Sequence, residues 1–398
     1  MKALTKIGIG FLSLAAVALW FTSCSSEDVA QNGGGLNEKD QRVLLLSVNT
    51  GNLGTRSTTP LSDDEKQISD MTVGIYDKSD NYRVVAKLAH NTDDKEASGS
   101  TEGHFKTNTS GVNVKVVTST LQKDDQVLVA VNRGDAFTSN PNSPTKFSEV
   151  TMDATTALQF KASSTDIDAT KFPKFGTAKL PAGSNSTFTA AVSVKNLVSR
   201  VTLEDLSVSF TGPYASATFT PTEIFLLNVP DKLAFSETGQ ASTTTYLNGT
   251  DIDKNGGTTG EKKAVLAKVI TGASALGSGS ASYTDKPILY TIPNSSTSNK
   301  TILVIAGKFK KDASPTTTEE PVYYPLALNE HYDSSHPTGT AADGGTKSQT
   351  LAGKNYKCKV VIKTIGASNP WVTTGPQTAV LTVDVENWDD ATQTTTFE

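Results

Sequence analysis

The chain contains 398 residues and has a formal net charge of −5 at pH 7, with acidic and basic residues interspersed along the sequence. Because no basic stripe is present, the sequence argues against a nucleic-acid partner. Thr, Ser, Val and Gly dominate while Met and His are scarce, which favours β-sheet over helix and predicts an all-β fold. With only two cysteines, Cys24 and Cys358, the fold must be held by its core and sheets rather than by a disulfide framework.

Residues 1–24 have the layout of a lipoprotein signal peptide. Lys2 and Lys6 precede an apolar run over 7–21, and Thr22-Ser23-Cys24 follows directly. The apolar run is too short for a membrane span, which needs about 20 residues. We therefore expect cleavage before Cys24 and attachment of lipid to its thiol; a plain secretory signal with an incidental cysteine is the alternative.

Residues 25–56 read as a propeptide that combines a tether, a strand and a cuttable loop. The tether is polar and Gly-rich. The strand has the apolar residues Val43, Leu44, Leu45, Leu46 and Val48. The loop that follows is rich in Gly, Asn and Thr and contains Arg56, so a trypsin-like protease cutting between Arg56 and Ser57 would detach everything before it. From local sequence alone, a solvated arginine in an ordinary turn is the stronger interpretation.

β-like runs bounded by turn residues recur in two blocks, 57–189 and 190–398, and the length suggests two domains. The runs of the first block are 71–76, 82–88, 112–117 and 126–131. Those of the second are 191–194, 200–210, 223–229, 288–292, 301–309, 322–328, 356–365 and 379–385. The segment 150–162 is predicted to be helical or mixed. The polar segment 238–282 is predicted to be surface loop.

The last predicted strand alternates between apolar and polar residues from Leu381 to Glu386. Its apolar side chains Ala379, Leu381, Val383 and Val385 share one face, which is the signature of a half-buried strand. The end of the chain beyond it is polar except for Phe397. The same pattern suits a strand of its own domain and a strand donated to another subunit, and the region 379–398 is our candidate donor.

Several short motifs follow one another in a defined order along the chain. They are Phe21-Thr22-Ser23-Cys24, Gly54-Thr55-Arg56 and the segments 68–76, 127–132, 194–201, 218–225, 323–326, 355–357 and 381–388. In this order they resemble the major fimbrial subunits of Bacteroidales, the fimbrillins or type V pilins. The resemblance covers nearly the whole chain, and it favours the cut after Arg56 over an ordinary turn.

The resemblance implies a fold and an assembly mechanism. The fold would be two transthyretin-like antiparallel β-sandwich domains with minor helix. The precursor would be an outer-membrane lipoprotein exposed on the cell surface and cleaved by an arginine-specific or trypsin-like protease. The lost strand would then be replaced by a C-terminal strand from a neighbouring subunit, giving a polymer of identical subunits joined to anchor and tip subunits and supporting adhesion and biofilm formation.

Three features imitate functional sites. Asp251-Ile252-Asp253-Lys254-Asn255-Gly256 resembles the start of a calcium loop, but the required twelfth position is Lys262. His331 and His336 lack further ligands at metal spacing and are expected on the surface. Cys358 is expected to be a half-buried structural cysteine rather than a reactive thiol. No nucleophile elbow, paired carboxylates or phosphate loop is found, so neither enzyme activity nor a cofactor or metal is expected.

Two alternatives to a stalk subunit stay open. A tip, accessory or anchor subunit of the same system would have a binding site, another C-terminus or resistance to cleavage. A glycan-binding surface lipoprotein would need stacked aromatic residues, whereas the aromatics here are few and scattered at strand positions, which argues for use in the core.

Overall fold

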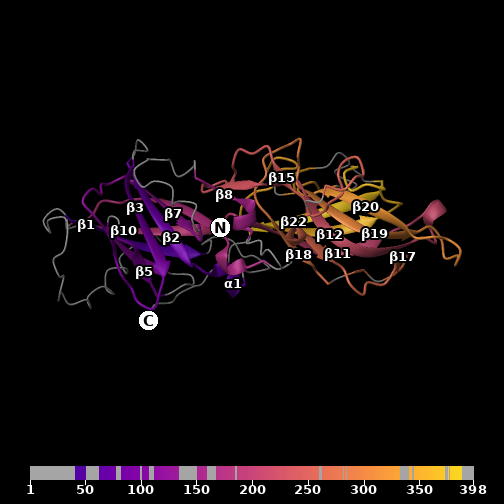
Figure 1. The fold of residues 1–398 in the computed structure, drawn as a ribbon, viewed down its shortest axis with the longest axis horizontal. Helices are drawn as coiled ribbons and strands as arrows, with labels where there is room; N and C mark the ends of the chain where they lie inside the picture. The colour runs from indigo at the N-terminus through magenta and orange to yellow at the C-terminus, as the bar shows by residue number, and fades with distance from the viewer. Residues whose placement is uncertain are drawn as a thin grey trace, which may run out of the picture. The chain divides into compact units, whose positions relative to one another are not determined.

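The computed structural model describes residues 41–50, 62–77, 82–98, 101–106, 112–133, 150–158, 167–183, 186–259, 262–280, 282–283, 285–331, 340–342, 345–372, 375 and 377–387. Within these ranges the fold is all-β, as predicted (Figure 1). The two α-helices found there, α1 (Asp63–Lys66) and α2 (Ala154–Ala157), have four residues each. Neither is long and apolar enough to cross a membrane.

Nine strands form the first sheet, drawn from indigo to magenta in Figure 1. Their order is β4 (Ala97–Ser98), β6 (Val112–Thr118), β1 (Arg42–Thr50), β10 (Thr187–Asn196), β9 (Lys174–Lys179), β7 (Gln126–Val131), β2 (Asp70–Tyr76), β3 (Tyr82–His90) and β5 (Gly103–Phe105). β10 and β9 share only two residue pairs, so the sheet divides there into two layers. A Cβ on Gly176 of β9 would lie 2.2 Å from the Ser193 carbonyl oxygen, which explains the glycine at this close approach.

The two layers enclose one apolar core. It is built from alternate residues of strands in both layers, among them Leu44, Val73, Val114, Val129 and Val192. Along β10, for example, Phe188, Ala190, Val192 and Val194 are buried while the residues between them are exposed. The period-two pattern of the sequence thus becomes the inner face of a sandwich.

The second group of strands forms a four-stranded and a five-stranded sheet, drawn from orange to yellow apart from the magenta β11 and β12 (Figure 1). The four-stranded order is β18 (Ile288–Thr291), β11 (Ser199–Val208), β21 (Lys354–Ile362) and β22 (Ala379–Asn387). The other sheet runs β16 (Ala267–Val269), β12 (Thr218–Leu227), β19 (Ile302–Lys310) and β20 (Glu320–Ala327), with β17 (Leu276–Gly277) also on β12. A core shared by both sheets also takes in Phe175 of β9, in the first sheet, and Phe172 and Leu197, which lie next to strands of that sheet.

Small elements complete the described chain. They are β8 (Thr151–Asp153) paired with β14 (Lys232–Ala234), β13 (Val229–Pro230) paired with β15 (Tyr246–Leu247), and the short 3₁₀ helices η5 (Ala169–Lys171), η6 (Gly212–Tyr214) and η7 (Ala264–Leu266). The segment expected to be helical or mixed contains β8 and α2 in its described part, 150–158. The expected loop 238–282 instead carries β15, η7, β16 and β17.

One predicted boundary needs correction. The sequence placed the start of the second block at residue 190 and counted the run 191–194 within it. That run is the middle of β10, which pairs with β1 over its length and with β9 at its end. The change from the first sheet to the second therefore comes at Leu197–Val198, between β10 and β11. Period-two alternation shows which face of a strand is buried and does not show which sheet the strand joins.

Candidate subunit-assembly site

β1 occupies an interior position in the nine-stranded sheet. It pairs antiparallel with β6 from Arg42↔Thr118 to Val48↔Val112. On its other edge it pairs parallel with β10 from Val43↔Thr187 to Thr50↔Val194. Both edges of its backbone are therefore bonded, and its removal would leave two unpaired strand edges facing each other across an empty slot.

The side chains of β1 divide between two faces. Leu44, Leu46 and Val48 are 0%, 1% and 0% exposed and belong to the core. Val43 and Leu45 point to the opposite face and are partly buried, so not every apolar residue of the predicted strand enters the core. Three fully buried apolar side chains contribute about 4.5–9 kcal/mol of transfer free energy, before chain entropy is counted.

Thr50 is the imperfect position of β1. Its side chain lies on the core face and is 4% exposed. Its Oγ1 has no hydrogen-bond partner within the described part of the chain. A buried hydroxyl without a partner lowers stability, so β1 fits its slot less well at this end.

The segments that flank β1 carry three of the predicted site residues. Cys24, Arg56 and Ser57 lie outside the described residues, as does Phe397 at the other end of the chain. The lipidation and cleavage assignments therefore stay predictions. The described chain resumes at Ser62, six residues after Arg56.

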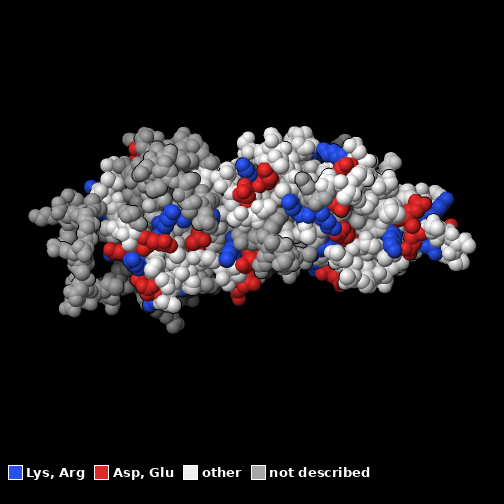
Figure 2. All heavy atoms as spheres, viewed as in Figure 1, with Lys and Arg blue, Asp and Glu red and all other residues white. Residues whose placement is uncertain are grey.

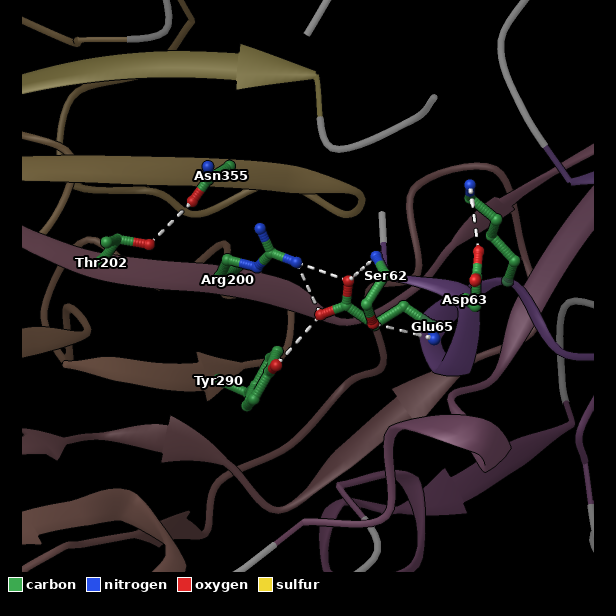
Figure 3. A network of polar contacts seen from close by, with 8 residues as sticks. Ser62, Asp63, Glu65, Arg200, Thr202, Tyr290 and Asn355 are labelled. Atoms are coloured by element: carbon green, nitrogen blue, oxygen red, sulfur yellow. Dashed lines mark hydrogen bonds and ion pairs between the residues drawn. The ribbon is translucent and has the colours of Figure 1, made fainter. Parts of the chain in front are cut away.

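A buried polar network begins where the chain resumes (Figure 3). Ser62 caps α1: its backbone N–H donates to Glu65 Oε2 at 2.7 Å, and its Oγ accepts from the Glu65 N–H at 3.3 Å. The same carboxylate accepts from Arg200 Nη2 at 2.6 and 2.5 Å and from the Tyr290 hydroxyl at 3.0 Å. Glu65 and Arg200 side chains are 2% and 5% exposed. Burial, and then the charge of Glu65, raise the pKa of Tyr290, so its hydroxyl stays a donor.

This network fixes the chain just after the predicted cut without using β1. Arg200 belongs to β11 and Tyr290 to β18, so α1 is bonded to two strands of the four-stranded sheet. The next residues are also held: Asn132 Oδ1 accepts from the Ser69 N–H at 2.7 Å, and its Nδ2 donates to the Gln67 carbonyl at 3.0 Å. Before the 51–61 segment, β1 is held by β6 and β10. After it, the chain is held by Arg200, Tyr290 and Asn132.

β22 contains four of the five candidate donor residues, all but Phe397, and is an edge strand. Within the described chain it pairs only with β21, antiparallel, from Lys354↔Asn387 to Ile362↔Ala379. Ala379, Leu381 and Val383 are 2%, 1% and 3% exposed, and Val385 packs partly buried against the same core. β22 thus lies in the sheet of its own chain, the alternative that the sequence left open beside donation.

The outer face of β22 carries acidic side chains paired with lysines. Glu386 lies 2.8 Å from Lys357 Nζ, and Asp384 lies 3.1 Å from Lys359 Nζ. Lys359 also lies 3.8 Å from Glu204 of β11. The hydrogen bond and charge of Asp384 raise the pKa of Lys359. These ion pairs connect β22, β21 and β11 on the side of the sheet away from the core.

Cys358 lies on the inner face of β21, opposite Val383 of β22. Its side chain is fully buried in the core, not half-buried as expected. Burial raises the pKa of the thiol, which is the reverse of the shift that makes a cysteine reactive.

The features that imitate metal sites have structural roles. Asp253 Oδ1 accepts the backbone N–H groups of Asn255 at 2.7 Å and Gly257 at 2.8 Å, which closes a turn. Lys262 occupies the position where a calcium loop would need an acidic residue, and its Nζ lies 2.6 Å from Glu223. Among the described residues no group of three or more His, Cys, Asp or Glu is arranged to hold a metal ion. His331 is partly buried, and His336 lies outside those residues.

Trp371 is the one tryptophan among the described residues. Its indole N–H donates to the Ile252 carbonyl at 2.6 Å, and Lys254 Nζ lies 5.4 Å from the ring centroid. The ring packs against a small core on the five-stranded sheet that includes Phe225 and Val304. These contacts use the ring within the fold. Charges on the face drawn in Figure 2 are mixed in sign, without a large patch of one kind.

Solved structures share this arrangement of sheets, although sequence comparison gives no match. No protein-family model matches the chain, and no curated protein does either. A protein from Bacteroides eggerthii named for a role in cell adhesion has a TM-score of 0.59 at 16% identity, covering 87% of this chain and 96% of its own. A fimbrilin (FimA) from Porphyromonas gingivalis W83 has a TM-score of 0.54 at 15% identity, covering 88% and 98%. The chain has the fold of a fimbrilin.

A third solved structure of this fimbrilin fold is a cell-adhesion protein by name from Parabacteroides distasonis, with a TM-score of 0.56 at 15% identity, covering 88% and 100%. Within the fold, β1 and β22 lie in different sheets of one chain, so the structure does not bring the two predicted strands together. Sequence reasoning missed Glu65, Arg200, Tyr290 and Thr50. Only the capping pattern Ser62-x-x-Glu65 could have signalled any of them.

Proposed function

We propose that this chain is a structural stalk subunit of a cell-surface fimbria that supports adhesion and biofilm formation. The precursor is an outer-membrane lipoprotein anchored through Cys24, and a trypsin-like or arginine-specific protease cuts it between Arg56 and Ser57. Loss of the segment ending at Arg56 removes β1 and opens the slot between β6 and β10. The region 379–398 of a neighbouring copy then fills the slot, so that identical subunits form a polymer that joins anchor and tip subunits.

The interior position of β1 carries the proposal. Its backbone is bonded on both edges and three of its side chains are in the core, yet it is joined to the rest of the chain only through the segment that contains Arg56. A single cut there therefore converts a complete sandwich into one with an open apolar slot. An open slot with two free strand edges favours the binding of an extended segment.

The pairing of β22 supports the direction of the exchange. Within the described residues β22 forms one ladder, with β21, whereas a strand in the β1 slot forms two. Each additional main-chain hydrogen bond contributes about 0.5–1.5 kcal/mol. The inward side chains Leu381, Val383 and Val385 repeat the two-residue spacing of Leu44, Leu46 and Val48. Transfer of the strand into a vacant slot thus gains one backbone ladder for the same kind of apolar face, and it uncovers the core beneath β22 in the donor chain.

Limited proteolysis tests the proposal. Trypsin treatment of the purified precursor should give SDS-resistant ladders and filaments. Arg56→Ala should stay uncut at this position and monomeric, because the slot stays filled. Arg56→Lys is the matched control: trypsin should trigger ladders from it, while an arginine-specific protease should not. Ladders from Arg56→Ala would contradict the proposal that cleavage after Arg56 triggers assembly.

A second experiment addresses the donor. A chain lacking 379–398 should be cut normally and form no joints. Because that deletion exposes the core beneath β22, a synthetic peptide of residues 379–398, added in excess during cleavage of the full chain, provides an independent check. It should occupy open slots and shorten the ladders, while a scrambled peptide should not. Unchanged ladders with both peptides would exclude this region as the donor.

A further inference from the structure

The outer face of β22 is chemically unlike the strand that it would replace. From Val43 to Thr50, β1 has no charged side chain. β22 carries Asp384 and Glu386, and both form ion pairs with lysines of β21. Both strands bury apolar side chains, but β22 is also held by ion pairs, which salt weakens.

Each of the two ion pairs joins β21 to β22 diagonally rather than between directly opposite residues. Lys357 is the ladder partner of Asp384 but its Nζ reaches Glu386, and Lys359 is the partner of Thr382 but reaches Asp384. Each lysine therefore bonds diagonally, two residues along β22, where long side chains can still meet. Because Lys359 also lies 3.8 Å from Glu204, the contacts extend to β11.

The two pairs differ in exposure. The Lys357 and Glu386 side chains are 8% and 23% exposed, and those of Lys359 and Asp384 are 47% and 56% exposed. Solvent and salt screen an exposed pair more than a partly buried one. The Lys357–Glu386 contact should therefore be the stronger of the two.

We propose that Asp384 and Glu386, with Lys357 and Lys359, form a charge latch that controls how often β22 leaves its own sheet. This inference rests on the proposed function in taking β22 as part of the donor. An edge strand bonded along one side needs an additional constraint to stay in place before assembly. The latch supplies it on the side of the sheet away from the core, through Lys357–Glu386 and Lys359–Asp384.

Cys358 provides a direct measure of latch opening. The thiol is fully buried beside β22 and faces Val383, so it reacts with a maleimide only when the strand moves away or the chain unfolds. The experiment uses the full uncut chain with Cys24→Ser, which leaves Cys358 as the one thiol. Labelling at low urea separates the two routes, because local opening exposes little surface and depends weakly on urea.

The double variant Asp384→Asn/Glu386→Gln should label at least about fivefold faster than the parent, with a weak urea dependence. Glu319→Gln is the matched control: it removes an ion pair with Lys308 at 3.4 Å on the other sheet and should leave labelling unchanged. Raising salt from about 0.05 to about 0.5 M should speed labelling of the parent and hardly affect the double variant. Equal labelling of parent and double variant, or faster labelling only through global unfolding, would overturn the latch.

The same variants separate the latch from the proposed function. If the double variant labels faster but neither it nor the parent forms ladders after cleavage, the latch is supported and strand donation is wrong. If the parent forms ladders and the double variant labels at the parental rate, donation is supported and the latch is wrong. If the latch and strand donation are both correct, the double variant should form ladders faster than the parent after the same degree of cleavage at Arg56.

Discussion

Thr50 places a hydroxyl group in the core of the first sandwich without a hydrogen-bond partner among the described residues. Valine has nearly the same shape and no polar atom to desolvate. Thr50→Val should raise the free energy of unfolding of the uncut chain by about 1 kcal/mol or more, measured by chemical denaturation. It should also slow dissociation of the peptide ending at Arg56 after cleavage.

Thr72 of β2 offers a matched control, because its Oγ1 is also buried without a described partner. Thr72→Val should stabilise the chain to a similar degree and leave dissociation of the cleaved peptide unchanged, since β2 stays in place. No gain in stability at either position would show that both hydroxyls find partners in solution.

The two faces of β1 should contribute unequally to its retention in the sheet. Leu46 is 1% exposed in the core, whereas Leu45 lies partly exposed on the other face. Leu46→Ala should cost about 2–5 kcal/mol and speed dissociation of the cleaved peptide by about 30-fold or more. Leu45→Ala should have a much smaller effect. Equal rates for the two variants, followed by mass spectrometry of the released peptide, would show that the core face does not hold β1.

The sequence predicts elements well where alternation is strong and poorly where pairing is distant. β2, β6 and β22 were found because apolar residues recur at every second position between turn residues, and β7 and β19 because they contain continuous apolar runs of strand length. β9 was missed because Lys174-Phe175-Gly176-Thr177-Ala178-Lys179 contains a buried lysine and a glycine. β10 was found but assigned to the wrong block, since its partner β1 lies far away in sequence. The local sequence predicts that β1 and β22 are strands, but it does not predict which strands they pair with.

Glu65 connects the region after the predicted cut to the second group of strands through Arg200 and Tyr290. Removing its carboxylate leaves the Arg200 guanidinium buried without its counter-charge. Glu65→Ala should therefore lower the free energy of unfolding by about 3–5 kcal/mol in chemical denaturation. The exposed Lys308–Glu319 pair is the comparison, and Glu319→Ala should cost about 0–1 kcal/mol. Similar losses in both variants would contradict a special role for the buried pair.

The interior placement of β1 also has a consequence for the order of folding. β1 is made before all other strands of its sheet, yet Val43 must pair with Val117 and with Thr187. Contacts between residues so far apart form slowly, because long loops must close first. During biogenesis the nascent chain therefore passes through a period in which the edge of β1 that later pairs with β10 is unpaired. Premature self-association is a hazard of that interval, and tethering β1 to the same chain reduces it by keeping its local concentration high.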